Sequence, residues 1–403
     1  MRILLISALY PPLMLGGAED SARNWAAWLV ANGHDVSVIR SADRDEAERT
    51  YVESDGVRVH VLRVPFVYPT FRFGEAPAWQ KPIWHLQDHF SKGCNAAVGR
   101  ILDQEQPDFV NVHLVQGLGY SILSEIGARR IPLVFTLHDL GLACLRMSMF
   151  KNGENCPGQC LPCRISARRK RSLVERQHKV AFVSPSRANL ETLERYFPLQ
   201  AYPCAVHLNP NAYPVPRVAR TESAELRLLY AGRIHSSKGV DILLEAVAQL
   251  ADHFPVRLAL AGRGQQEAEL RARYGDKPWC RFLGFVSQQE LADHMAQSDL
   301  LCAPSIWAEN SPGVVVQALA TALPVMASDR GGIPELVRDG VNGRLVSVTS
   351  ASEWAKAIRR VIVGEEALAD WRAYARENAR KFAQDTIARR LLAWITDFVG
   401  QPA

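Results

Sequence analysis

The chain alternates short apolar runs with amphipathic stretches along its whole length. Most runs are continuous stretches of Val, Ile and Leu, which is typical of strands buried on both faces of a parallel sheet. The first half contains six predicted strands, at residues 3–7, 35–39, 57–62, 109–113, 133–138 and 180–184. The second half contains six more, at residues 226–232, 257–262, 281–286, 300–305, 323–328 and 343–348. Amphipathic helices are predicted between them, for example at residues 19–31 and 240–251.

A proline-rich segment divides the two repeats of this βα pattern. Residues 209–223 contain three prolines and interrupt any periodic signal. The pattern therefore predicts an α/β protein with two doubly wound, Rossmann-like domains facing a cleft, at residues 1–208 and 222–384. The last helical pattern, 385–403, is expected to cross back to the first domain. Ligands of such sheets bind outside the carboxyl ends of the strands.

Composition limits the kind of protein that can carry this pattern. With 403 residues, 48% of them hydrophobic and 22% charged, the chain can form two cores of ordinary domain size. A net charge of +5 is mild, and with no recognition motif we expect no nucleic-acid partner. The initial apolar run is too short for a secretory leader, and no stretch approaches the roughly 20 apolar residues that span a bilayer. We expect a cytoplasmic protein.

Two segments of the first half leave alternatives open. Residues 164–179 hold seven Lys or Arg against one acid, Glu175. Such a run is typical of a solvated helix face, or it makes peripheral contact with anionic lipid at the inner face of a membrane. Residues 65–90 hold seven aromatic side chains, which pack beneath a long loop or shape a surface for an acceptor or a lipid.

The chemistry-bearing residues concentrate in the second half. Arg233 and Lys238 follow a predicted strand and precede a helix, where cations and free backbone N–H groups can meet a diphosphate. About seventy residues later, Ser-Pro-Gly at 311–313 opens a helix and leaves bare N–H groups beside the Glu309 carboxylate. Together these segments suggest a nucleotide-sugar site.

An ordered set of short motifs carries a family resemblance. They are Gly16-Gly17, Gly33-His-Asp-Val36, Thr136-Leu-His-Asp139, Ser184-Pro-Ser186, the Gly232–Gly239 segment, Leu283-Gly-Phe-Val286 and the segment from Glu309 onward. This series resembles glycosyltransferase family 4, whose members have the GT-B fold. The resemblance implies retaining, metal-independent transfer of a sugar from a UDP-, GDP- or ADP-linked donor to a glycan or lipid-linked acceptor of a cell envelope. The second domain would bind the donor and the first domain the acceptor.

The resemblance also implies roles for single residues. Cations near the leaving phosphate stabilise the charge that develops there, and Glu309 would bind donor-sugar hydroxyls. The implied catalytic residues are Arg233, Lys238, Glu309 and His138, the last contacting the sugar ring. The implied donor-binding residues are Gly16, Gly17, Gly232, Gly262, Phe285, Gly313, Val314, Val315 and Gln317. His113 and Asp139 are the implied acceptor-binding residues. Core packing explains Phe285 equally well.

One position departs from the family pattern. The family's Glu-x7-Glu motif has a second acid that holds the ribose hydroxyls, and counting from Glu309 reaches Gln317 instead. An amide oxygen still accepts a hydrogen bond but carries no charge, so we expect about 1 kcal/mol weaker donor binding. This departure supports the alternative of a non-catalytic nucleotide- or glycan-binding subunit. A nucleotide-sugar epimerase is a second alternative.

Four of the eight cysteines cluster in one loop. Cys144, Cys156, Cys160 and Cys163 have the spacing C-x11-C-x3-C-x2-C in a Gly- and Pro-rich segment. In a cytosolic chain, this spacing favours a structural zinc or iron–sulfur centre, with free thiols and disulfides as alternatives. We expect no cofactor to be required for catalysis.

Overall fold

The computed structural model of the chain describes residues 1–151, 153–347 and 350–402. These form two compact units. Unit 1 comprises Met1–Met149, Cys156–Asn211 and Ile387–Ala403, and unit 2 comprises Phe150–Asn155 and Ala212–Thr386. The sequence placed the boundary at residues 208–222, and the units change between residues 211 and 212. The two short strands β7 (Phe150–Lys151) and β8 (Glu154–Asn155) pair antiparallel and group with unit 2.

Unit 1 is built on one eight-stranded sheet. Its strands are β1 (Arg2–Ser7), β2 (Asp35–Ser41), β3 (Arg49–Val52), β4 (Arg58–Leu62), β5 (Phe109–Leu114), β6 (Leu133–Thr136), β9 (Val180–Ser184) and β10 (Cys204–Val206). They lie in the order β10-β9-β6-β5-β1-β2-β4-β3. Neighbouring strands are parallel except β3, which runs antiparallel to β4 at the edge.

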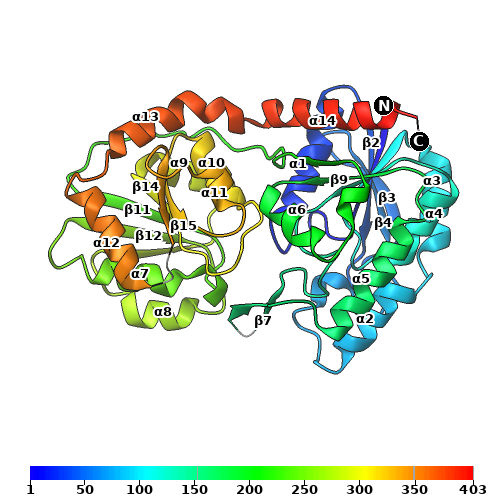
Figure 1. Cartoon of the computed structure of the whole chain (residues 1–403), viewed down its shortest axis with the longest axis horizontal. Helices are drawn as coiled ribbons and strands as arrows, with labels where there is room; N and C mark the ends of the chain where they lie inside the picture. Colours follow the sequence, from blue (N-terminus) through cyan, green and yellow to red (C-terminus); the bar gives the residue numbers. More distant parts are fainter. Residues whose placement is uncertain (152, 348–349, 403) are drawn as a thin grey trace. The chain divides into compact units, whose positions relative to one another are not determined.

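Helices cover both faces of this sheet (Figure 1). They are α1 (Gly17–Ala31), α2 (Gln80–Phe90), α3 (Asn95–Glu105), α4 (Leu123–Ala128), α5 (Leu161–Val174) and α6 (Arg187–Glu194). Side chains of β1 alternate between two buried clusters. Leu4 and Ile6 pack with residues of α3, α4 and α5, whereas Ile3 and Leu5 pack with residues of α1. Burial on both sides explains why β1 reads as a continuous apolar run.

The last helix, α14 (Gln384–Gly400), contributes to unit 1 from residue 387 onward. Ala388, Leu391, Ile395 and Phe398 recur every three or four residues, which places them on one helix face. All four are buried in the cluster that contains Trp25 of α1. This apolar stripe holds the end of the described chain against the first sheet.

Unit 2 is built on a six-stranded, fully parallel sheet. Its strands are β11 (Leu226–Ala231), β12 (Val256–Ala261), β13 (Cys280–Gly284), β14 (Leu300–Ala303), β15 (Val325–Ser328) and β16 (Gly343–Val346), in the order β13-β12-β11-β14-β15-β16. Its helices are α7 (Val240–Ala248), α8 (Glu267–Tyr274), α9 (Gln288–Gln297), α10 (Gly313–Ala320), α11 (Ile333–Leu336), α12 (Ala351–Ile362) and α13 (Leu368–Asn378). Helices α7 and α12 pack side by side, and α9 and α10 lie on the opposite face (Figure 1).

The prediction of an α/β protein with two Rossmann-like sheets is confirmed. Strand ends differ from the predicted ones by at most two residues, and β6 ends at Thr136, so that His138 lies beyond the strand. The predicted strand 343–348 is observed to Val346, and its last residue, Val348, lies outside the described residues. Two edge strands, β3 and β10, were not predicted. Among the described residues, no helix is both long enough and apolar enough to span a bilayer.

Candidate functional site

Both sheets have a topological switch point at which the strand order reverses. In unit 2 it lies between β11 and β14, and in unit 1 between β1 and β5. Ligands of doubly wound sheets bind outside the carboxyl ends of the strands at such points. In unit 2, Lys238 follows β11 and Glu309 follows β14. In unit 1, Gly16 follows β1, and His113 lies near the end of β5.

The turn after β11 is held tightly against the segment after β14. A short 3-10 helix, η4 (Ser236–Lys238), leads into Gly239, whose φ of +63° is left-handed. A Cβ at Gly239 would lie 2.1 Å from the Pro304 carbonyl oxygen, so only glycine fits this contact. The Ser237 carbonyl accepts a hydrogen bond from the Ile306 N–H at 2.9 Å. Lys238 is thereby fixed beside the residues that precede α10.

Lys238 and Glu309 form an ion pair at this point. The Lys238 Nζ atom lies 2.5 Å from Glu309 Oε1, and the Ser305 hydroxyl donates to the same oxygen at 2.5 Å. Burial favours a raised pKa for the Glu309 carboxyl, but the Lys238 charge and these two hydrogen bonds outweigh it and lower the pKa below its usual value. The Trp307 ring lies 5.1 Å from Lys238 Nζ. Glu309 is therefore an ionised, nearly buried acceptor.

Arg233 differs from Lys238 in having its side chain exposed. Its backbone is fixed, because the Tyr230 hydroxyl donates to the Arg233 carbonyl at 2.7 Å. Within the described parts of the chain, its guanidinium forms no ion pair or hydrogen bond. Five donors therefore remain available at the end of β11 for an anionic ligand.

The start of α10 matches the expectation only in part. Pro312 caps the helix, and the Val315 N–H donates to the Pro312 carbonyl at 2.9 Å. The predicted use of the Val315 N–H for a ligand is therefore wrong, because the first helical turn already engages it. For the N–H groups of Gly313 and Val314, the described structure contains no acceptor. Two donors, rather than three, face outward at this helix start.

Gln317 lies one turn further along α10 and is 2% exposed. Its side-chain Nε2 has no hydrogen-bond partner among the described residues. A buried amide donor without a partner is costly and uncommon in proteins. Gln317 is thus a polar group that a ligand can satisfy.

The remaining predicted donor residues of unit 2 lie on neighbouring strand ends. Gly232 follows β11 and Gly262 follows β12, and a Cβ at Gly262 would lie 1.8 Å from the Gly232 carbonyl oxygen. This close approach requires glycine, as does the φ of +143° at Gly262. Phe285 follows β13 and is 76% exposed, so the core-packing explanation for this ring is wrong. Its face is open to a ligand.

In unit 1, the turn after β1 carries an unexpected acid. Helix α1 begins at Gly17, and the Glu19 carboxylate accepts the Gly16 N–H at 3.0 Å. The N–H of Gly16, which the resemblance implied to be a donor-binding residue, is therefore already engaged. Burial raises the pKa of Glu19, although backbone hydrogen bonds, including the one from Gly16, oppose the shift.

A chain of hydrogen bonds orients the two histidines. The Asn111 amide nitrogen donates to the Val134 carbonyl at 3.0 Å, so Asn111 Oδ1 is an acceptor and the facing His113 Nε2 (3.0 Å) is its donor. Neutral His113 then accepts at Nδ1 from His138 Nε2, 2.8 Å away. His138 Nδ1 is left as an acceptor, with Asn209 Nδ2 at 3.4 Å. Both rings have a defined tautomer.

Both imidazoles are neutral near pH 7. Burial lowers the pKa of His138 to about 4. Burial, reinforced by the neighbouring His138, lowers the pKa of His113 well below its ordinary value. The pair lines a cavity of about 40 Å³ together with Asp139 and Gln116. Neutral imidazoles in a cavity can exchange hydrogen bonds with sugar hydroxyls but cannot provide a cation.

Asp139 belongs to a buried charge cluster that includes a residue missed by sequence reasoning. Lys170 of α5 is 1% exposed and donates to the Gly141 carbonyl at 2.5 Å. Burial lowers the pKa of Lys170 to about 8, opposed by the charges of Asp88 and Asp139. Burial also raises the pKa of Asp139 to about 6. The sequence showed Lys170 only as part of a basic run, although it shares the face of Cys163, Ser166, Ala167, Leu173 and Val174.

The four clustered cysteines lie in unit 1 and are not disulfide-bonded. Cys144 and Cys163 are buried with their Sγ atoms 3.9 Å apart. The Cys163 thiol also contacts Cys160, and burial raises its pKa to about 12. Cys156 packs against the same core cluster. Among the described residues, no three or more His, Cys, Asp or Glu side chains are arranged around a common point as metal ligands, so the metal centre stays a prediction.

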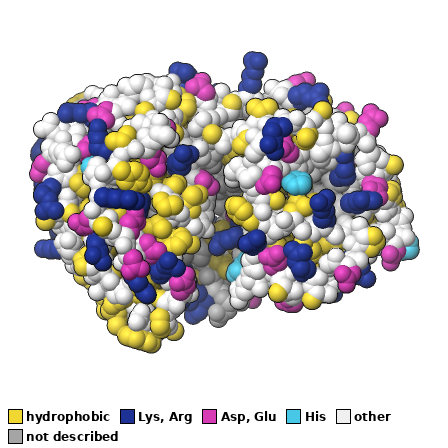
Figure 2. Space-filling model, turned by 180° about the vertical axis from the view of Figure 1, so that it is seen from behind, with side chains coloured by type: hydrophobic (Ala, Val, Ile, Leu, Met, Phe, Trp, Pro, Cys, Tyr) yellow, Lys and Arg dark blue, Asp and Glu magenta, His cyan; other side chains and the backbone are white. Residues whose placement is uncertain are grey.

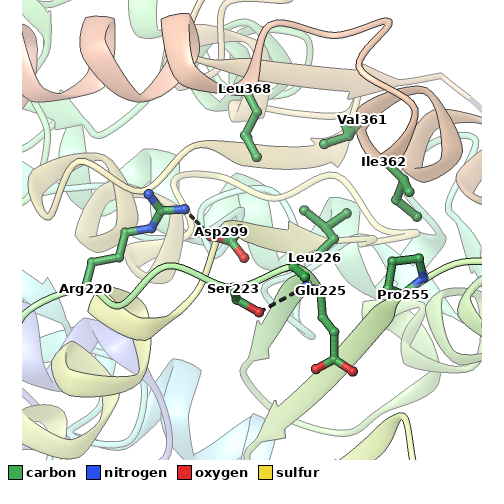
Figure 3. Close-up of a pocket in the computed structure, with 10 residues that line it drawn as sticks. Arg220, Ser223, Glu225, Leu226, Pro255, Asp299, Val361, Ile362 and Leu368 are labelled. Carbon is green, nitrogen blue, oxygen red and sulfur yellow. Dashed lines mark hydrogen bonds and ion pairs between the residues drawn. The ribbon is translucent and has the colours of Figure 1, made fainter.

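Unit 2 has a larger hollow elsewhere, of about 220 Å³. It lies at the amino ends of β11 and β14, where Leu226 and Asp299 line it (Figure 3). The Arg220 guanidinium pairs with Asp299 within it. Because ligands of doubly wound sheets bind at the opposite strand ends, the hollow is separate from the residues around Lys238.

Comparisons with known proteins identify both units. A family model described as "Glycosyl transferase 4-like domain" matches residues 16–185, and one described as "Glycosyl transferases group 1" matches residues 225–363. A phosphatidyl-myo-inositol mannosyltransferase of Mycolicibacterium smegmatis is 26% identical over 94% of this chain and 89% of its own length. A D-inositol 3-phosphate glycosyltransferase of Nocardioides is 36% identical over 41% of this chain and 40% of its own length.

The fold has a counterpart among solved structures. The Anabaena protein HepE, crystallised with UDP and glucose, superposes with a TM-score of 0.69 at 21% identity. The match covers 98% of this chain and 99% of HepE. With a matching family model on each sheet and this shared architecture, the chain is a glycosyltransferase of the family 4 type, and its two Rossmann-like units are those of a GT-B fold.

Proposed function

We propose that this glycosyltransferase takes its sugar from a nucleoside-diphosphate donor, retains the anomeric configuration and needs no metal ion for catalysis. The observation that carries the proposal is that two cationic residues follow β11 in the same turn. Arg233 is exposed with an uncommitted guanidinium, and Lys238 is fixed by Glu309. Both lie at the strand ends where a doubly wound sheet binds its ligand.

These cations suit the chemistry of the departing group. Cleavage of a sugar–diphosphate bond leaves negative charge on phosphate oxygens, and positive groups placed in advance at that point lower the barrier. Arg233 would bind two oxygens through its planar fork, and Lys238 would act as a point charge. A divalent metal would then be unnecessary, since the protein supplies the compensating charge.

Glu309 would bind the sugar itself. Its carboxylate is ionised, because the Lys238 charge and the Ser305 hydroxyl outweigh the effect of burial on its pKa. An ionised carboxylate is an acceptor for two sugar hydroxyls. The outward N–H groups of Gly313 and Val314 supply donors beside it. The site would thus address both the sugar and the phosphates.

Similar proteins support the class of donor and acceptor. HepE is described in complexes with UDP and with UDP-glucose. The mycobacterial relative is named for mannosyl transfer to a phosphatidyl-inositol. We infer a UDP-, GDP- or ADP-linked sugar as donor and a glycan or lipid-linked sugar as acceptor, in cell-envelope polysaccharide or glycolipid synthesis. His113, His138 and Asp139 of unit 1 would bind sugar hydroxyls.

The experiment measures nucleotide binding first and transfer second. UDP, GDP and ADP are each added to the protein, and one of them is expected to raise the melting temperature. Arg233→Ala and Lys238→Ala should reduce this shift and lower transfer at least tenfold, because a charged hydrogen bond contributes roughly 1.5 to 3 kcal/mol. Arg257→Ala is the matched control, since Arg257 pairs with Glu225 on an exposed surface of the same unit.

The possible results separate the hypotheses. Near-normal transfer by both variants would contradict the leaving-group role. A nucleotide-induced shift without turnover on any sugar donor would favour the non-catalytic subunit, for which Gln317 is the supporting feature. Nuclear magnetic resonance of the product tests retention, and transfer in excess chelator tests independence from metal.

We also propose that the four-cysteine loop binds a structural zinc ion or an iron–sulfur centre. Three features support this: the short distance between Cys144 and Cys163, the contact of Cys163 with Cys160, and a backbone N–H of Leu145 directed at the Cys163 sulfur. Backbone donors to sulfur commonly accompany thiolate–metal sites. Cys156 and Cys160 would complete the ligand set.

Elemental analysis of the purified protein tests this second proposal. About one zinc ion per chain, or iron with matching sulfide, is expected, and Cys160→Ser should remove it. Cys204→Ser is the control, because Cys204 lies outside the loop. Metal-free protein with four freely titrating thiols in the loop would contradict the proposal, as would a disulfide between two of them.

A further inference from the structure

Helices α2 and α5 of unit 1 present an apolar face to solvent. Six of the fifteen exposed large hydrophobic side chains of the described chain lie on these helices or directly before α2. Trp79, Ile83, Leu86 and Phe90 are 68%, 40%, 61% and 54% exposed, and Leu161 and Ile165 of α5 are 61% and 52% exposed. Isolated exposed apolar residues are common, but a cluster of this kind marks an interaction site.

Helical spacing places these residues on one side of each helix. Trp79, Ile83, Leu86 and Phe90 recur every three or four residues, so that they form one stripe. The opposite face of α2 packs into the protein. Trp84 on that face is 1% exposed and donates from its indole nitrogen to the Tyr68 carbonyl at 3.1 Å. The outward stripe therefore makes no contribution to the core of unit 1.

The two helices form one continuous surface. His89 Nε2 of α2 lies 2.7 Å from the Ser166 hydroxyl of α5, and the Arg169 guanidinium lies 5.6 Å from the centre of the Phe90 ring. Ile165 lies one turn before Arg169 on the same side of α5. Figure 2 shows hydrophobic side chains gathered at the lower end of the unit that contains α2 in Figure 1.

The exposed charges on these two helices all have one sign. Helix α5 contains no Asp or Glu, and the only acid of α2, Asp88, is fully buried. The cations at the surface are Lys81, Lys92, Arg164, Arg168, Arg169 and Arg171. Among the residues that the structure describes, only Arg171 of these six has an acidic partner, Glu175 at 2.6 Å. Exposed Trp and Phe beside Arg and Lys, on helices that expose no acid, are typical of a helix that lies in the interface of an anionic bilayer.

We propose that the α2–α5 surface, defined by the six apolar residues and six cations named above, docks unit 1 on an anionic membrane. The apolar stripe would enter the boundary between head groups and acyl chains, and the arginines would bind lipid phosphates. Phe90 and Arg169 couple the two contributions, because their side chains already touch. The proposal concerns a surface separate from the residues after β11 and does not depend on the donor.

The test is co-sedimentation of the whole chain with two kinds of vesicle at about physiological salt concentration. One kind is phosphatidylcholine alone, and the other also contains about 30 mol% phosphatidylglycerol. We expect binding to the anionic vesicles, weak binding to the neutral ones, and loss of binding at high salt. Each cation near such a surface contributes about fivefold, so Arg164→Glu with Arg168→Glu should weaken binding at least about twentyfold. Trp79→Ser with Leu86→Ser should also weaken it strongly.

Matched variants keep the proposal falsifiable. Arg257→Glu and Val215→Ser alter an exposed cation and an exposed apolar residue of unit 2, and both should bind vesicles like the wild type. Thermal unfolding and transfer to a water-soluble acceptor should be unchanged in the surface variants, because all four substituted residues are exposed. Equal binding to neutral and anionic vesicles would overturn the proposal. A wild-type dimer that only the apolar variant disrupts, with vesicle binding intact, would also overturn it and assign the surface to a second copy.

Discussion

Lys238 and Glu309 are 71 residues apart in sequence, and their charged atoms lie 2.5 Å apart at the strand ends of unit 2. The side chains are 19% and 7% exposed, so water screens the pair only weakly. The pair lowers the pKa of Glu309 against the effect of its own burial. It therefore keeps a carboxylate ionised and fixes a lysine at the same point.

Replacing Glu309 by Gln should destabilise unit 2. The change removes one partner of a nearly buried pair and leaves Lys238 without its counter-charge, which we expect to cost about 2 kcal/mol of unfolding free energy. Urea unfolding followed by circular dichroism measures this loss. Glu225→Gln is the control, because the exposed Glu225–Arg257 pair should contribute less than about 1 kcal/mol. Equal effects of the two substitutions would show that the Glu309 pair is no more buried in solution than the control pair.

A methyl group at Gly262 should disrupt the strand ends that carry the donor residues. Its Cβ would lie 1.8 Å from the Gly232 carbonyl oxygen, so the two backbones must separate. We expect Gly262→Ala to lose more than about 3 kcal/mol of stability and most nucleotide-induced thermal stabilisation. At Gly340, φ is +71° but the space is open, so Gly340→Ala should cost only about 1–2 kcal/mol of backbone strain. Similar losses in both would refute the steric explanation.

The strands of the two sheets were predictable because burial on both faces produces continuous apolar runs. This holds for β1, in which Leu4 and Leu5 face different clusters and both must be apolar. The edge strand β3 could not be predicted in this way, since its residues are mostly exposed and its sequence, Arg-Thr-Tyr-Val, carries no such constraint. Its place depends on pairing with β4, a contact that local sequence does not encode.

The candidate site was predictable where chemistry is local to a motif. Arg233, Lys238 and Glu309 stand out by residue type and by position after apolar strands. Two hydrogen bonds could not be predicted, because each depends on the geometry of a single turn. The Val315 N–H donates to the Pro312 carbonyl, and the Gly16 N–H donates to the Glu19 carboxylate. Lys170 was hidden among exposed arginines. Only its position on the buried face of α5, one turn beyond Ser166 and Ala167, distinguishes it.

The neutral histidine pair should make unit 1 less stable in acid. Burial lowers the pKa of His138 to about 4 in the folded state, against about 6.5 in the unfolded chain. As pH falls below 6.5, the unfolded state binds a proton first. Stability that is fully present above pH 6.5 is therefore lost progressively down to pH 4. The pKa shift sets an upper bound of about 3 kcal/mol on this loss of unfolding free energy. Solvent reaches the half-buried ring, so the actual loss is smaller than this bound.

Variants isolate this contribution from those of other groups. The raised pKa of Asp139 has the opposite effect on the pH dependence of stability between about pH 4 and 6. Asp139 is present in the wild type and in both variants, so its effect cancels in the comparison. His138→Asn should flatten the fall in melting temperature between pH 6.5 and 4 relative to wild type. His253→Asn, at an exposed position of unit 2, should leave the slope unchanged. An unaltered slope in the His138 variant would mean that folding does not lower the pKa of this ring.

Gln317 offers the sharpest test of the donor pocket. Its Nε2 is buried without a partner in the described structure, so the free protein bears a cost that a ligand oxygen can relieve. Gln317→Glu should lower the stability of the free protein by about 2 kcal/mol, because it buries an unpaired carboxyl. The same variant should bind the stabilising nucleoside diphosphate about fivefold more tightly, because a carboxylate is the stronger acceptor for ribose hydroxyls. Gln317→Leu should bind it about fivefold more weakly, and Gln249→Leu, at the exposed end of α7, should bind like the wild type. Calorimetric titration gives all four affinities, and unchanged affinity in both Gln317 variants would place the ribose away from α10.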